Sequence, residues 1–174
     1  MTNEPAPANA LVRDAVDADA DALAAIYNHG IASRLATFET EPRTPAQLRE
    51  RIADTGTWPL QVATDAGGRV LGWAGLSAYR PRACYAGIGE FSIYLDPQAQ
   101  GRGIGTALLS SLVEAAAARG FWKLVSRIFP ENAASRALCR RCGFREVGLY
   151  EKHGRLDGRW RDVVIVERLI PRNL

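Results

Sequence analysis

The 174-residue sequence has few of the residues that build metal and disulfide sites: three cysteines and two histidines. An odd number of cysteines does not form a fully paired disulfide framework, and a reducing cytoplasm would keep them as thiols. Cys139-Arg-Arg-Cys142 has the spacing of a redox or metal motif, but it lies late in a predicted helix and has no second pair elsewhere. We therefore predict a cytoplasmic protein that binds no metal.

The sequence also lacks an apolar run long enough to cross a membrane. Its first ten residues have neither the basic flank nor the apolar segment of a secretory signal, so residues 1–9 are expected to form a flexible tail. The net charge of +3 is small and both signs are interspersed, which argues against a nucleic-acid-binding surface. The length and the 47% of hydrophobic residues predict one globular domain over residues 10–174, with neither nucleic acid nor membrane as a partner.

Hydrophobic periodicity and turn residues predict an order of strands and helices that is typical of an α+β domain. Strands are expected at residues 11–15, 60–64, 69–79, 88–95, 122–129, 144–151 and 163–169. Helices are expected at residues 17–28, 46–53, 106–119 and 131–142, with a break near Gly30 and a separate helical stretch at residues 31–34. Asp65-Ala-Gly-Gly68 lies between two strands and predicts a hairpin, hence antiparallel pairing.

A glycine-rich segment, Gln100-Gly101-Arg102-Gly103-Ile104-Gly105, joins the strand at residues 88–95 to the helix that follows. The start of a helix presents unpaired backbone N–H groups and a partial positive charge, and glycines let a phosphate approach the main chain closely. The spacing is not that of the dinucleotide motif G-x-G-x-x-G, and no Gly-Lys-Ser/Thr follows. The segment therefore predicts a phosphate cradle, with a glycine-rich helix start that binds no ligand as the alternative.

The Gln-x-x-Gly-x-Gly pattern resembles the GNAT superfamily of N-acetyltransferases, and the resemblance covers about residues 10–170. Five more specific segments are similar to phosphinothricin acetyltransferases: Ala-Thr-Phe-Glu-Thr-Glu-Pro at 36–42, Tyr-Arg-Pro-Arg at 79–82, Gly-Glu-Phe-Ser-Ile-Tyr-Leu at 89–95, Glu-Asn-Ala-Ala-Ser at 131–135 and Gly-Arg-Trp-Arg-Asp-Val at 158–163. In addition, residues 142–158 are similar to the related arsinothricin N-acetyltransferases. The resemblance implies a three-layer α+β fold, with a mixed, mostly antiparallel sheet of about seven strands flanked by about four helices. It also implies a homodimer that transfers acetyl from acetyl-CoA to the α-amine of an anionic, amino-acid-like small molecule.

The same resemblance implies two sets of cofactor contacts. The main chain of Ile93, Tyr94 and Leu95 would contact the pantetheine arm and the thioester, although core packing is an equally ordinary role for these side chains. The pyrophosphate would lie on the loop formed by Gly101, Arg102, Gly103, Ile104, Gly105 and Thr106. On the helix at 131–142, Asn132, Ser135 and Arg141 are the implied contacts, with helix capping and solvent exposure as the alternatives for Asn132 and Arg141.

Glu90 and Cys139 are the candidate catalytic residues. Acetyl transfer to an amine requires a base, and loss of hydration in an apolar strand prepares a carboxylate for that task. The resemblance places the general base at Glu90; the alternative is a glutamate exposed to solvent at a sheet edge, or one that forms an ion pair with Arg80 or Arg82. Cys139 stands where many related enzymes have tyrosine or histidine to protonate the departing thiolate. A thiol, with an ordinary pKa of about 8.5, could donate that proton, or water could.

The substrate would be recognised by basic and aromatic side chains. Guanidinium groups match carboxylate, phosphinate or arsenate-type oxygens, and the resemblance assigns that task to Arg80 and Arg82; a basic surface loop is the alternative. Possible aromatic walls, which could equally be packing residues, are Phe38, Tyr85, His153 and Trp160. Two other functions stay open: acetylation of a protein terminal amine, and a sensor that binds acetyl-CoA without catalysis.

Overall fold

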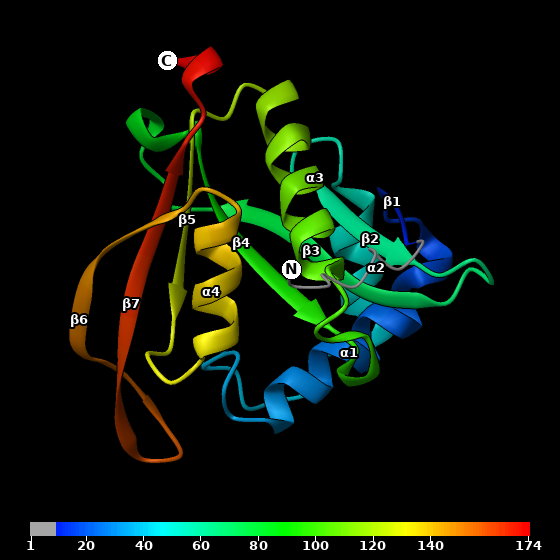
Figure 1. Ribbon diagram of the computed structural model, residues 1–174, viewed down its shortest axis with the longest axis horizontal. Helices are drawn as coiled ribbons and strands as arrows, with labels where there is room; N and C mark the ends of the chain where they lie inside the picture. The colour runs from blue at the N-terminus through cyan, green and yellow to red at the C-terminus, as the bar shows by residue number, and fades with distance from the viewer. Residues whose placement is uncertain (1–9) are drawn as a thin grey trace, which may run out of the picture.

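The computed structural model describes residues 10–174, so the tail predicted for residues 1–9 lies outside the described residues. Seven strands and four helices follow one another in the predicted order (Figure 1). The strands are β1 (Leu11–Asp14), β2 (Leu60–Thr64), β3 (Val70–Ala78), β4 (Ile88–Leu95), β5 (Lys123–Ile128), β6 (Arg145–Leu156) and β7 (Arg159–Leu169). The helices are α1 (Ala20–Ala32), α2 (Pro45–Ala53), α3 (Ile104–Ala118) and α4 (Ala133–Arg141).

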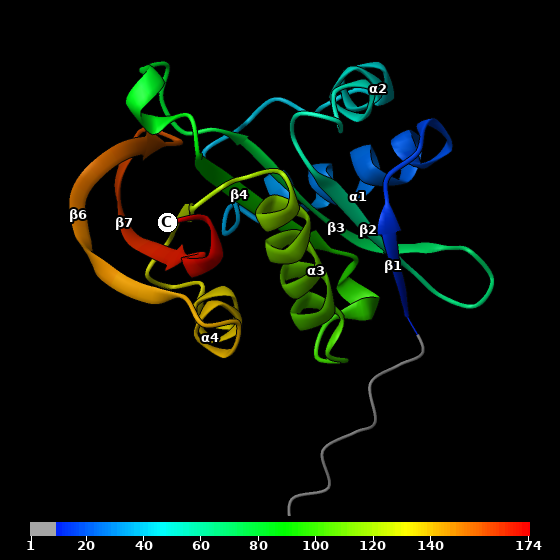
Figure 2. The same cartoon turned by 90° about the horizontal axis from the view of Figure 1, so that it is seen from above.

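The strands form one mixed sheet in the order β1-β2-β3-β4-β5-β7-β6. Every neighbouring pair is antiparallel except β4 and β5, which are parallel. Figure 2 shows α1 and α2 on one face of the sheet and α3 and α4 on the other. The predicted three-layer α+β fold is therefore confirmed.

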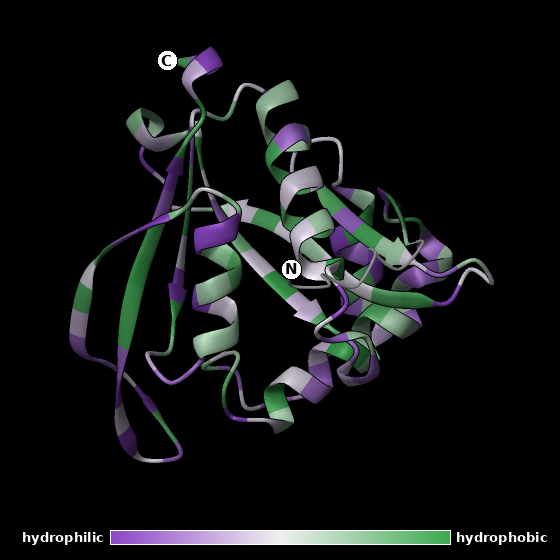
Figure 3. Ribbon diagram, viewed as in Figure 1, coloured by the Kyte–Doolittle hydropathy of each residue, from purple (hydrophilic) through white to green (hydrophobic). Residues whose placement is uncertain are grey.

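Each face of the sheet has its own hydrophobic core. The larger core joins α3 and α4 to the sheet and includes Leu108, Leu112 and Phe91, and the smaller one joins α1 and α2 to Trp73. The apolar positions of α3 recur at helical spacing, which directs one side of the helix onto the sheet. Figure 3 shows that hydrophilic residues gather at the turn that joins β6 and β7. The rest of the hairpin is packed: β7 contributes Val164 and Val166 to the larger core, and Leu156 and Val163 form a small third cluster with Phe129.

The predicted break at Gly30 is wrong, because α1 continues through this residue to Ala32. A Cβ atom at position 30 would lie 3.0 Å from the ring of Tyr94 on β4. Gly30 therefore does not end the helix; because it has no side chain, it allows α1 to pack closely on the sheet. The helix ends at Ser33, before Arg34 adopts a left-handed conformation with φ of 57°.

The last hairpin is longer than the sequence reading predicted. Instead of ending near residue 151 and resuming at 163, β6 runs to Leu156 and β7 begins at Arg159. Asp157 and Gly158 connect them with φ values of 48° and 75°. Two residues with positive φ are typical of the tight hairpin turn that Asp-Gly favours. This dipeptide indicated the position of the turn, and the predicted strand boundaries did not take it into account.

The sheet opens between its two parallel strands. β4 and β5 pair only from Ile88 with Lys123 to Glu90 with Val125. Beyond this point β4 stays paired with β3 as far as Leu95, whereas β5 stays paired with β7 as far as Ile128. The edge of β4 that faces β5 therefore has no β5 partner after Glu90.

Two classes of structure are not found among residues 10–174. No helix there has the length and apolar character needed to cross a membrane. No cluster of three or more histidine, cysteine, aspartate or glutamate side chains there is arranged to hold a metal ion.

Truncation of the core under α3 is expected to destabilise the fold. Leu112 is fully buried, so Leu112→Ala should lower the free energy of unfolding by about 3 kcal/mol, because transfer energy is lost and a cavity remains. Urea denaturation measures this change. As a control, Leu11→Ala at a position that is 64% exposed should change the same quantity by less than about 0.5 kcal/mol. Equal effects of the two substitutions would contradict the assigned core.

Candidate active site

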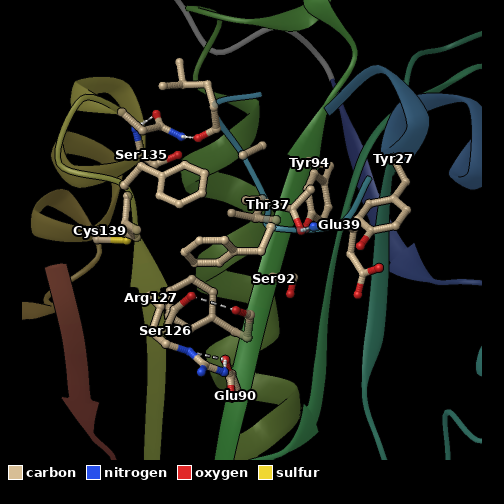
Figure 4. A pocket seen from close by; sticks show the side chains of 18 residues that line it. Tyr27, Thr37, Glu39, Glu90, Ser92, Tyr94, Ser126, Arg127, Ser135 and Cys139 are labelled. Atoms are coloured by element: carbon tan, nitrogen blue, oxygen red, sulfur yellow. Dashed lines mark hydrogen bonds and ion pairs between the residues drawn. The ribbon is translucent and has the colours of Figure 1, made fainter. Parts of the chain in front are cut away.

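A cavity of about 400 Å³ opens where β4 and β5 diverge. Figure 4 shows side chains from both strands, from α4 and from the segment between α1 and α2 turned into it. It is lined by Tyr27, Leu35, Ala36, Thr37, Phe38, Glu39, Glu90, Phe91, Ser92, Ile93, Tyr94, Ser126, Arg127, Ile128, Phe129, Asn132, Ser135 and Cys139. The divergence of the two strands therefore leaves a cavity between them that is lined by both polar and apolar side chains.

Glu90 lies in this cavity and is paired with Arg127. Nε of Arg127 donates to Oε1 of Glu90 at 3.0 Å, and Nη2 contacts the same oxygen. Figure 4 shows the guanidinium reaching from β5 to the carboxylate on β4. The ion pair of Glu90 with Arg80 or Arg82, the alternative considered above, is not formed, because Arg127 is the partner of this carboxylate. Glu90 has a side-chain exposure of 21%, so it is sheltered yet reachable from the cavity.

The glycine-rich loop has the geometry of an anion cradle. Gly101 and Gly103 have φ values of 72° and 77°, which glycine adopts without strain, and Gly103 is the N-cap of α3. A Cβ added at either position would meet no described atom within 4 Å, so the space outside the loop is open. The helical hydrogen bonds of α3 begin with the N–H of Ala107, which donates to Gly103 at 3.2 Å. The amides just before it are available to an anion.

Gly105 has a different role from the two loop glycines. It lies inside α3, and a Cβ there would come within 3.1 Å of Leu138 on α4. Its missing side chain allows the two helices to pack closely. Arg102 and Thr106 flank the open space, and Arg102 is exposed. These residues fit the diphosphate that the resemblance implies, although their contact with it stays a prediction.

Asn132 connects α4 to the opposite wall of the cavity. Its side-chain oxygen accepts from the N–H of Ser135 at 3.1 Å, which confirms the expected helix cap. Its amide nitrogen donates to the carbonyl of Leu35 at 3.2 Å. Asn132 therefore fixes the start of α4 against the segment after α1, while Ser135 lines the cavity between them. Arg141 lies exposed in the last turn of α4, outside the lining.

Cys139 lines the cavity from α4 and is 1% exposed. Burial raises the pKa of the Cys139 thiol to about 12, with Cys142 and Glu146 adding to the effect. The thiol therefore stays protonated at neutral pH and releases its proton reluctantly. This environment weakens the case for Cys139 as a proton donor.

Tyr94 is half-buried among aromatic side chains and also lines the cavity. Its ring lies 4.9 Å from that of Trp73 and 4.7 Å from that of Tyr27. Burial, reinforced by neighbouring Tyr27, raises the pKa of the Tyr94 phenol, so the phenol is neutral across the physiological range. Ile93 beside it also lines the cavity, whereas Leu95 lies beyond the lining.

The expected substrate residues are divided between the cavity and the surface. Phe38 lines the cavity, where its ring packs edge-on against Phe129 at 4.8 Å. Arg80 and Arg82 lie exposed in the segment between β3 and β4, outside the lining. The other three expected walls, also outside the lining, are Tyr85, His153 and Trp160, which contact Tyr79, Tyr150 and Arg155 respectively. Their roles stay predictions.

Sequence reasoning missed Arg127, although a signal was present. Leu124 and Ile128 are core residues, so alternation along β5 places Arg127 on the opposite face of the sheet. That face also carries Glu90, whose pairing partner Val125 precedes Arg127 by two residues. Sequence reasoning also made no prediction for several polar lining residues, namely Tyr27, Thr37, Glu39, Ser92 and Ser126.

Comparison with known proteins gives consistent matches. The family description "Acetyltransferase (GNAT) domain" matches residues 10–145. The chain is 40% identical to the phosphinothricin N-acetyltransferase of Streptomyces coelicolor over 168 residues, which cover 94% of this chain and 98% of that protein. It is 37% identical to the L-methionine sulfoximine/L-methionine sulfone acetyltransferase of Pseudomonas aeruginosa over 164 residues, which cover 91% and 94% of the two chains.

One solved structure shares both the fold and the sequence. It is the crystal structure of a GNAT superfamily phosphinothricin acetyltransferase from Sinorhizobium meliloti in complex with acetyl-CoA. The TM-score is 0.86 at 40% identity, and the match covers 92% of this chain and 88% of that one.

The burial of Cys139 and Cys142 predicts selective thiol chemistry. Burial raises the pKa of both thiols, whereas Cys84 is exposed. At pH 8 a disulfide reagent should therefore modify Cys84 rapidly and the buried pair at least about 100-fold more slowly. Absorbance of the released chromophore follows the reaction. Cys84→Ser should abolish the fast phase and Cys139→Ser should retain it; a fast phase that survives Cys84→Ser would contradict the burial.

Proposed function

Because the chain belongs to the GNAT acetyltransferase family, we propose that it transfers the acetyl group of acetyl-CoA to the α-amine of an anionic, amino-acid-like compound. The single observation that carries this proposal is the open edge of β4, which begins at Glu90 beside the cavity and leads toward the glycine-rich start of α3. The named acceptors of the relatives are phosphinothricin and methionine sulfoximine or sulfone. We extend the proposal to these compounds and to arsinothricin, whose tetrahedral side chain is of similar form.

The chain's own residues can hold acetyl-CoA in an extended path. The main-chain amides of Gly101–Thr106 would bind the diphosphate, with Arg102 adding positive charge. The open edge of β4 at Ile93–Leu95 would pair with the pantetheine arm, since this edge has no β5 partner. Bound acetyl-CoA supplies an acetyl group that is already activated as a thioester.

In this proposal Glu90 deprotonates the acceptor amine. Only the neutral amine is a nucleophile, so the ammonium form must lose a proton before or during attack. Arg127 holds Oε1 of Glu90, which leaves Oε2 outside this contact. A backbone N–H on the open edge of β4 can stabilise the negative charge that develops on the acetyl oxygen. Both reactants would be bound together, and the amine would attack directly.

In this proposal the coenzyme A thiolate leaves without a dedicated acid and is protonated by the solvent after release, because a thiol of ordinary pKa has a thiolate stable enough to depart. Transfer of a proton from Cys139, whose pKa burial raises to about 12, to a thiolate of ordinary basicity would be uphill. The cavity also presents the phenol groups of Tyr27 and Tyr94. Burial disfavours ionisation of Tyr94 in the same way, so we assign no side chain to this step.

We further propose that the chain is a cytoplasmic homodimer. Its free cysteines suit a reducing compartment, and cell fractionation that recovered the chain outside the cytoplasm would contradict that location. Edge strand β6 exposes Val147, Leu149 and Tyr150 at 48%, 49% and 53%, and Trp160 on β7 is equally exposed at 53%. Exposed apolar side chains on and beside an edge strand are suited to burial against a second copy.

Removal of the proposed base should affect turnover more than cofactor binding. Glu90→Gln keeps the size of the side chain but cannot accept a proton, so kcat should fall by about 100-fold or more. The Kd for acetyl-CoA, measured by calorimetry, should change by less than about threefold. A thiol-release assay with methionine sulfone measures turnover, and Glu50→Gln at an exposed site on α2 is the control. Unaltered turnover in Glu90→Gln would remove Glu90 from this role.

The same assay separates the two rival functions. Tight acetyl-CoA binding by the wild-type chain, without acetylation of any amino acid or peptide, would favour a sensor. Acetylation of peptide terminal amines alone would favour a protein acetyltransferase. The approximately 400 Å³ cavity, closed on one side by residues 35–39, suits a small acceptor better than a peptide.

The dimer proposal makes a prediction about mass in solution. Sedimentation equilibrium should give twice the chain mass of 18.9 kDa, because the β6 surface is buried between copies. The double substitution Leu149→Lys and Tyr150→Lys should shift the equilibrium toward the monomer through charge repulsion. A wild-type chain that sediments as a monomer would contradict the proposal.

A further inference from the structure

The cavity contains a single basic side chain. Arg127 is the only lysine or arginine among its lining residues, counted over the described residues 10–174. Two carboxylates accompany it: Glu90, with which it is paired, and Glu39 in the segment after α1. Arg80 and Arg82, the arginines expected to bind the substrate, lie outside this lining. An anion that enters the cavity therefore meets Arg127 as its cationic contact there.

Arg127 is both oriented and accessible. Its Nε and Nη2 bind one carboxylate oxygen, which fixes the plane of the guanidinium at the end of β5. Its side chain is nevertheless 48% exposed, so the fork is not sealed by this contact. Guanidinium groups bind carboxylates through paired N–H donors, and Arg127 retains such donors beyond the Glu90 contact.

We propose that Glu90 and Arg127 together recognise the two charges on the α-carbon of the acceptor, an inference that rests on the proposed function. The α-ammonium would bind Glu90 and the α-carboxylate would bind Arg127. An α-amino acid carries these opposite charges on one carbon, and the ion pair presents the complementary charges in direct contact. Arg127 is thus a specificity-determining residue that selects α-amino acids over simple amines, and it places the ammonium beside the base.

This assignment divides the recognition of an anionic amino acid between two places. Arg127 would bind the α-carboxylate, which every acceptor of this class has. Arg80 and Arg82, in the exposed segment between β3 and β4, would be left for the oxyanion of the side chain. Substitutions at the two places should therefore affect different features of the acceptor.

The test compares three acceptors by steady-state kinetics with saturating acetyl-CoA. They are L-methionine sulfone, its primary carboxamide, in which the carboxylate is replaced by a neutral group of similar size, and phosphinothricin, which has an anionic side chain. The variants are Arg127→Gln, Arg127→Lys and Arg80→Gln. The readout is the ratio of kcat/KM values for two acceptors, so a general loss of Glu90 positioning cancels.

The wild-type chain should prefer methionine sulfone over its carboxamide by about 30-fold, the range of a charge-assisted hydrogen-bonded contact. Arg127→Gln should reduce this ratio to within about threefold of unity, and Arg127→Lys should give an intermediate ratio, because it keeps the charge but loses the fork. Arg80→Gln should leave this ratio unchanged and instead lower the preference for phosphinothricin over methionine sulfone.

Two results would overturn this inference alone, and a third would also overturn the proposed function. A wild-type ratio near unity, or a ratio that Arg127→Gln leaves unchanged, would show that Arg127 does not bind the α-carboxylate, even though acetyl transfer itself occurs. Failure of the wild-type chain to acetylate all three acceptors, with acetyl-CoA bound, would overturn the proposed function and this inference with it.

Discussion

The divergence of two parallel strands determines most of what this chain can do. β4 follows β3 to its end and β5 follows β7, so only the three residue pairs from Ile88 to Glu90 hold the two halves of the sheet together. Where the pairing stops, the hydroxyl of Ser126 donates to the carbonyl of Phe91 at 2.9 Å, which satisfies the last backbone group before the gap. Beyond it, unpaired main chain and cavity space become available to a ligand without any insertion in the fold.

The charged and helical parts of the site are arranged around this gap. Glu90 is the last β4 residue paired with β5, and Arg127 lies on β5 just beyond the pairing, so the two side chains meet where the strands separate. The α3 start lies after the far end of β4, where the open loop glycines Gly101 and Gly103 leave backbone amides exposed. A long ligand could therefore extend along the edge of β4, with its anionic end at α3 and its reactive end at Glu90.

The sequence predicted the fold well because its signals were local. Alternation, proline at strand ends and a glycine-rich helix start identified β4, the loop and α3, and Glu90 within them. The role of Gly30 was predicted wrongly because a glycine is required there by a tertiary contact with Tyr94, which the local sequence does not show. The length of the last hairpin was missed although Asp157-Gly158 indicated the turn. Arg127 was missed because its importance depends on which strand lies beside β4, and this pairing joins residues more than thirty positions apart.

A crystal structure of the chain with bound acetyl-CoA and an unreactive acceptor analogue would test the central claim most directly. The account predicts the diphosphate within hydrogen-bonding distance of the main-chain amides of residues 101–106. It also predicts the pantetheine arm along the open edge of β4, and the acetyl carbon beside the carboxylate of Glu90. A diphosphate bound elsewhere, or a Glu90 carboxylate directed away from the acetyl carbon, would contradict it.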